Sequence, residues 1–159
     1  MPTYQDLKQE VVYIGEYELE QCHGEVGSNN SGVYVNRYLN GLAPDGSPWC
    51  AGLVSWCYMN GADHTEMLMP FKYSVSAIDI YNQFKKRNWI VEYEYLEPGD
   101  LIFFTRVGGH HVGIIRTIDQ ARNICTIEGN LGEFPALVKY KYYCDDGSIP
   151  NLIGYGGPR

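Results

Sequence analysis

The chain has 159 residues, of which 45% are hydrophobic and 19% are charged, and its net charge is −7 at pH 7. A chain of this length and composition can bury a substantial core, so we expect one folded domain and no disordered acidic tail. The negative net charge offers no general attraction for nucleic acid, and no apolar run reaches transmembrane length. We therefore expect neither a nucleic-acid partner nor membrane insertion.

The start of the chain carries a helix signal and no secretory leader. Thr3 and Asp6 form a capping-box pattern, and Leu7, Val11 and Ile14 follow at helical spacing, which predicts an amphipathic first helix. The segment MPTYQDLKQEVVYIG has neither a basic start nor an apolar core. We therefore expect synthesis in the cytoplasm without a signal peptide.

Another helix is predicted in the segment SPWCAGLVSWCYMNG. Ser47 suits the N-cap, Pro48 suits the first helical position, and Gly61 can end the helix. This assignment places Cys50 in the first helical turn.

The remaining signals predict two more helices and then a sheet. Helical stretches are expected at residues 33–39 and 76–87, and strands at 101–104, 111–116, 124–128, 140–143 and 152–155. A turn, EPGD, precedes the first of these strands. Helices followed by strands indicate an α+β fold, with N-terminal helices packed on an antiparallel sheet of about five to six strands.

The five cysteines cannot all pair, and their spacing contains no CxxC zinc signature. At a helix start, unsatisfied N–H groups and the positive end of the dipole stabilise a thiolate, so Cys50 is the candidate nucleophile. The alternative is that Cys50 opens a buried stripe with Leu53 and Cys57, because unpaired cysteines are commonly core residues. Cys57 lies deeper in the helix, and Cys125 alternates out of phase with Glu128, so we expect both to be structural.

The candidate bases are His110 and His111 in VGGHHVGII. His111 shares a strand face with Gly113, whose small size leaves room for another group beside the imidazole, whereas His110 points away. Without a nucleophile nearby, either histidine would be an ordinary residue at a loop end. His23 and His64 have no comparable context and are expected at the surface.

A third group should orient the imidazole, and Glu128 and Asn130 are the candidates. A hairpin within DQARN brings the strand of Glu128 and Asn130 beside His111. In a register where one of these two residues lies directly opposite His111, that residue and the histidine share a face of the sheet. The alternative is a solvated glutamate and a turn asparagine. A zinc site from Cys50, His110, His111 and Glu128 can be drawn, but the spacing does not demand it. We expect no metal and no cofactor.

Four motifs, PWCAGLVSW, EPGDLIFF, GHHVGII and IEGN, occur in this order. Together they resemble the CHAP family of cysteine, histidine-dependent amidohydrolases and peptidases. With EVGSNNSGVYVNRYLNG, which is similar to a segment of CHAP proteins in phage lysins, the resemblance covers about residues 24–130. It implies a papain-like core within a single catalytic domain, residues 1–159, in which residues 1–20 add an N-terminal helix.

The resemblance also implies roles for individual residues. Cys50 matches the family nucleophile, His111 the base, Glu128 the acidic orienting residue and Asn130 a further polar residue of the same motif. Some CHAP domains bind calcium through an acidic cluster before the cysteine, and here NGLAPDGSPW offers only Asp45. We therefore expect no calcium requirement. Because His110 directly precedes His111, His110 remains an alternative candidate for the base.

The resemblance implies a peptidoglycan hydrolase that cleaves an amide bond through a thiolate and an acyl-enzyme. It would be an N-acetylmuramoyl-L-alanine amidase or a peptidoglycan endopeptidase, and bacterial peptidoglycan would be its substrate. Delivery through holin pores, on a phage tail or by a secretion system would let it act on the wall after release or injection. The alternatives are a cysteine amidase or transferase on a non-wall substrate, and a non-catalytic binding module with the same fold. The oligomeric state does not follow from the sequence.

Overall fold

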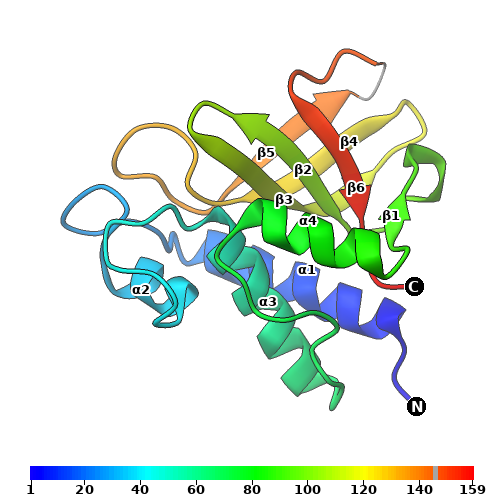
Figure 1. The fold of residues 1–159 in the computed structure, drawn as a ribbon, viewed down its shortest axis with the longest axis horizontal. Helices are drawn as coiled ribbons and strands as arrows, with labels where there is room; N and C mark the ends of the chain where they lie inside the picture. The colour runs from blue at the N-terminus through cyan, green and yellow to red at the C-terminus, as the bar shows by residue number, and fades with distance from the viewer. Residues whose placement is uncertain (145–146) are drawn as a thin grey trace.

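The computed structural model describes residues 1–144 and 147–159 and shows the predicted α+β fold (Figure 1). Its helices are α1 (Tyr4–Glu20), α2 (Val33–Leu39), α3 (Cys50–His64) and α4 (Ala77–Lys86), with a 3-10 turn η1 (Tyr93–Tyr95). Its strands are β1 (Ile90–Val91), β2 (Leu101–Arg106), β3 (Gly109–Ile118), β4 (Asn123–Glu128), β5 (Lys139–Cys144) and β6 (Leu152–Gly156). They form one antiparallel sheet in the order β1-β6-β2-β3-β4-β5, which is consistent with a papain-like fold.

The sheet buries apolar side chains on both faces, because successive residues of a strand point to opposite sides. The face that packs against the helices contributes Leu101, Phe103, Val112, Ile114 and Ile127. The other face contributes Ile102, Phe104, Ile115, Ile124 and Tyr155. The uninterrupted apolar run at the start of β2 follows from this double burial.

Helix α1 begins at the predicted capping box. The hydroxyl of Thr3 accepts from the main-chain N–H of Asp6 at 3.3 Å, and the Thr3 N–H donates to the Asp6 carboxylate at 2.7 Å. Leu7 and Val11 are fully buried, as expected for the apolar face of an amphipathic helix. Neither α1 nor any other helix of the described residues has the length and apolar content needed to cross a membrane.

Helix α3 begins later than the sequence predicted. Its first residue is Cys50 and its N-cap is Trp49, so the prediction of Ser47 as cap and Pro48 as first helical residue is wrong. The indole of Trp49 is fully buried, and its Nε1 donates to Glu25 at 3.2 Å. Burial of this large side chain fixes where the chain turns into the helix and outweighs the local capping preference.

The predicted end of α3 at Gly61 is also wrong, because the helix continues to His64. Gly61 faces α1, where an added β-carbon would lie 3.2 Å from side-chain atoms of both Leu7 and Val11. This glycine therefore allows two helices to pack closely rather than ending one of them.

The turn before β2 joins α1 to the sheet. Gly99 has a φ of +92°, and its N–H donates to the main-chain oxygen of Ile115 at 2.7 Å. The next residue, Asp100, is fully buried and accepts from Lys8 at 3.2 Å and from Arg159 at 2.7 and 2.8 Å. A buried carboxylate requires such partners, since an unpaired buried charge is strongly destabilising.

Alanine substitutions at two glycines with positive φ test this packing. At Gly99 a β-carbon would lie 2.4 Å from Cβ of Lys8, whereas at Gly41, with a φ of +72°, it would meet nothing within 4 Å. We expect Gly41→Ala to lower the free energy of unfolding by about 1–2 kcal/mol through backbone strain. Gly99→Ala should cost about 1–3 kcal/mol more because of the clash. Urea denaturation measures both, and equal losses would contradict the close approach of Lys8.

Candidate active site

Cys50 and His111 meet where the start of α3 abuts β3. The cysteine is the first residue of the helix, and the histidine is the third residue of the strand. The thiol lies close enough to the imidazole and to the main chain of Val112 for both to affect its pKa. Each of the two side chains is only 4% exposed. The structure thus brings together two residues that lie 61 positions apart in the sequence.

Glu128 lies on the other side of the imidazole. Its Oε1 is 3.1 Å from Nε2 of His111, and its side chain is fully buried. The hydroxyl of Tyr143, on β5, donates to both carboxylate oxygens at 3.2 and 3.0 Å.

The contact between Glu128 and His111 runs diagonally across the sheet. The pairing of β3 with β4 ends at Ile114 opposite Ile127, and one further step places Glu128 opposite Gly113. Glu128 is therefore not directly opposite His111, as one of the considered registers required. A β-carbon on Gly113 would lie 2.6 Å from Cγ of Glu128, so the glycine provides the space through which the carboxylate reaches the imidazole.

Asn130 occupies a different position from Glu128. Its φ is +58°, and its main-chain oxygen accepts from Nη1 of Arg106 at 3.2 Å. The same Nη1 lies 3.4 Å from Nδ1 of His111. Within the described residues, no hydrogen bond joins the Asn130 side chain to His111. Of the two orienting candidates, the structure brings the glutamate into contact with the imidazole and uses the main chain of the asparagine to hold an arginine.

Arg106 and Tyr143 are site residues that the sequence analysis missed. Arg106 ends β2 and pairs with Gly109 across a tight hairpin, so it shares a face with Phe104 and His111. This alternation was a usable signal. Tyr143 pairs with Ile124, four residues from the glutamate that its hydroxyl contacts, and no local pattern indicates such a contact.

The electrostatics favour a thiolate next to an imidazolium. Burial raises the pKa of the Cys50 thiol, but the hydrogen bond and charge of His111 and the charge of Arg106 outweigh it and lower this pKa. Burial lowers the pKa of His111, but hydrogen bonds and charges from Cys50 and Glu128 outweigh it and raise this pKa to about 9. For Cys57, burial raises the thiol pKa well above its usual value, as suits a core residue.

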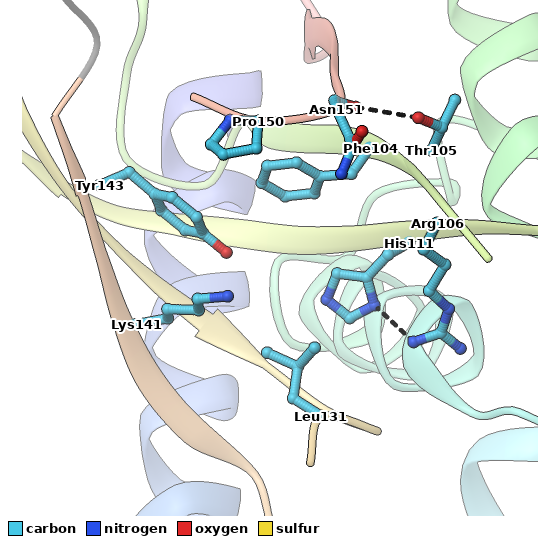
Figure 2. A pocket seen from close by; sticks show the side chains of 9 residues that line it. All are labelled: Phe104, Thr105, Arg106, His111, Leu131, Lys141, Tyr143, Pro150 and Asn151. Carbon is cyan, nitrogen blue, oxygen red and sulfur yellow. Dashed lines mark hydrogen bonds between the residues drawn. The ribbon is translucent and has the colours of Figure 1, made fainter. Parts of the chain in front are cut away.

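Two cavities flank the Cys50–His111 pair. One, of about 230 Å³, is lined by Cys50 and His110, and the other, of about 220 Å³, is lined by His111 and Lys141. Arg106 lines both. Figure 2 shows the second cavity, with Arg106 and His111 on one side and Lys141 on the opposite side.

The other two histidines lie away from this site. His64 is 53% exposed and, as expected, at the surface. The same expectation is wrong for His23, whose ring stacks on Tyr34 with centroids 3.8 Å apart and contacts buried Glu18 at 2.7 Å. In residues 1–144 and 147–159, no group of three or more histidine, cysteine or acidic side chains is arranged to hold a metal.

The fold and the site define an α+β protein with a buried cysteine, histidine and carboxylate cluster at a helix start. The family model of the CHAP domain matches residues 42–130, more than half of the chain. The protein therefore belongs to the CHAP domain family, an amidase- and peptidase-type hydrolase family, as the resemblance predicted. Comparison with curated proteins and with solved structures found no match.

The pH dependence of thiol labelling tests the ion pair. A lowered pKa at Cys50 and a pKa of about 9 at His111 keep thiolate and imidazolium together at pH values above the lowered thiol pKa and below about 9. We expect iodoacetamide to alkylate Cys50 below the usual pKa of a thiol, while buried Cys57, whose thiol pKa is raised, stays unmodified. Timed labelling and mass spectrometry of the digest measure this. Labelling of Cys57 before Cys50 would contradict it.

Gly113→Ala tests the diagonal contact. The added methyl group displaces the Glu128 carboxylate, so the pKa of His111 should fall and that of Cys50 should rise. We expect the labelling profile of Cys50 to move up by about one pH unit. The control is Gly15→Ala, whose methyl group would approach side-chain atoms of Ile127 on the same strand at 3.1 Å. If both variants shift the profile equally, a general disturbance of β4 is responsible.

Proposed function

We propose that the protein is a peptidoglycan hydrolase that cleaves an amide bond with Cys50 as nucleophile. The supporting observation is the buried contact of Cys50 with His111, in which the two pKa values shift in opposite directions. Peptidoglycan is the general substrate of the CHAP family, which supports this substrate class. The helices and the sheet share one core, so we also propose that residues 1–159 act as a single catalytic domain.

In the first half of the proposed reaction, the Cys50 thiolate attacks the carbonyl carbon of the amide. The first helical hydrogen bond of α3 runs from Leu53 N–H to Trp49 C=O at 2.9 Å, so the N–H of Cys50 lies ahead of the helical ladder. This N–H and the helix dipole can stabilise the oxyanion. The His111 imidazolium then gives its proton to the leaving amine, and a thioester remains on the enzyme.

In the second half, the neutral imidazole of His111 takes a proton from water, and the hydroxide attacks the thioester carbonyl. The sulfur departs as a thiolate while the proton stays on His111, which regenerates the thiolate–imidazolium pair and releases the acid product. Glu128 keeps the imidazole oriented through both halves because its carboxylate is itself fixed by the Tyr143 hydroxyl.

Digestion of purified peptidoglycan tests the proposal. Mass spectrometry of the released fragments identifies the new amine and carboxyl ends, which also shows whether the sugar–alanine bond or a peptide bond is cut. Cys50→Ala should reduce the rate by about 1,000-fold or more. Cys22→Ala removes an exposed thiol far from His111 and should leave the rate unchanged. Unchanged peptidoglycan with the wild type would reject the substrate, and an active Cys50→Ala variant would reject the nucleophile.

A further inference from the structure

The cavity shown in Figure 2 opens on the sheet face that the helices do not cover. Its volume is about 220 Å³, and His111 forms part of its wall. Apolar walls come from Phe104, Leu131 and Pro150, and the ring of Tyr143 lies beside them. The reaction mechanism uses only the edge of this space, so most of the cavity is available to another part of the substrate.

In residues 1–144 and 147–159, the charged side chains that line the cavity are positive, although the whole chain carries −7. Among the described residues, the lining includes Arg106 and Lys141 but no aspartate or glutamate. The neighbouring carboxylate, Glu128, lies between His111 and Tyr143, is fully buried, and has its oxygens bonded to the imidazole and to the Tyr143 hydroxyl. An anionic group of the substrate would therefore meet two cations here.

Arg106 has N–H groups that its contacts within the protein do not use. Among the described residues, its contacts with the Asn130 oxygen, at 3.2 Å, and with His111, at 3.4 Å, both use Nη1. A guanidinium has five N–H groups in a planar fork, so those on Nη2 and Nε can bind an oxygen anion. The hydrogen bond to the Asn130 oxygen holds the fork in place, which lowers the entropic cost of binding.

Lys141 is positioned by an aromatic ring. Its Nζ lies 5.1 Å from the ring centroid of Tyr143, and that ring packs on Phe104 with centroids 5.3 Å apart. Its main-chain oxygen accepts from the hydroxyl of Thr126 at 3.3 Å. In Figure 2 the ammonium group faces the cavity from the side opposite to His111. The lysine is thus held toward the same space as the arginine.

We propose that this cavity is a carboxylate subsite, in which Lys141 and Arg106 bind a carboxylate next to the scissile amide. Arg106 also lines the cavity that contains Cys50, so a carboxylate bound there belongs to a residue adjacent to the attacked carbonyl. Charge-assisted hydrogen bonds to a carboxylate are stronger than those to a neutral amide. This inference rests on the proposed function: the enzyme prefers stem-peptide bonds beside a free carboxylate over the same bonds beside a carboxamide.

Two synthetic muropeptides that differ only in this carboxylate or carboxamide measure the preference. The wild type should have a kcat/KM about tenfold higher for the acid. Lys141→Met removes the ammonium and keeps an unbranched side chain, so kcat/KM for the acid should fall about fivefold and that for the carboxamide less than about twofold. Lys86→Met removes the same charge from the exposed end of α4 and should change neither value.

Either of two results would overturn the subsite. Wild-type enzyme that cuts both muropeptides equally well has no carboxylate preference. If kcat/KM of the Lys141→Met variant falls equally for both muropeptides, the substitution has removed something other than a carboxylate contact.

A second measurement separates the subsite from the wall substrate. N-Acetylglutamate or its neutral diamide is added as a protector while iodoacetamide alkylates Cys50, at constant ionic strength. We expect the acid to slow alkylation of the wild type more than the diamide does, and to slow that of Lys141→Met less. Protection by the acid with both muropeptides left intact would reject peptidoglycan as substrate and support the subsite. Equal protection by the two ligands would reject the subsite.

Discussion

The fully buried carboxylate of Glu128 sets the main physical constraint on this molecule. Moving a carboxylate out of water costs several kcal/mol, and only well-placed partners recover it. Two partners are present, the imidazole of His111 and the hydroxyl of Tyr143, and they come from two different strands. The register of β3, β4 and β5 must therefore be held closely, because a slip of one residue would leave the charge without them.

Cys50, the proposed nucleophile, is held by a separate set of contacts that ends next to the same strand. Trp49 packs over Gly129, where an added β-carbon would lie 2.4 Å from the indole ring. Its Nε1 donates to Glu25, and the second oxygen of Glu25 accepts from the N–H of Ala136 at 2.8 Å. Since Trp49 directly precedes α3 and Gly129 directly follows Glu128, one indole ring links the start of the helix to the strand that orients the base.

The extent to which the site was predictable follows from how local each signal is. A cysteine at a helix start and a histidine sharing a face with Gly113 are visible within a few residues, and the fold class followed from the order of helix and strand signals. The boundaries of α3 were wrong because a buried indole and a close helix contact, both non-local, replaced the usual cap and stop. Arg106 and Tyr143 were missed because their positions depend on hairpin pairing and on a third strand.

Charges of opposite sign lie on the two sides of His111, and their effects add. Glu128 behind the ring favours the imidazolium, and Arg106 in front of it favours the Cys50 thiolate. Each charge alone would stabilise only one member of the pair. In the low dielectric of a buried site these interactions are only weakly screened, so the two shifts reinforce each other. A chain with a net negative charge can in this way place a positive side chain beside the Cys50 thiol, since local placement and not the total charge determines the field at the thiol.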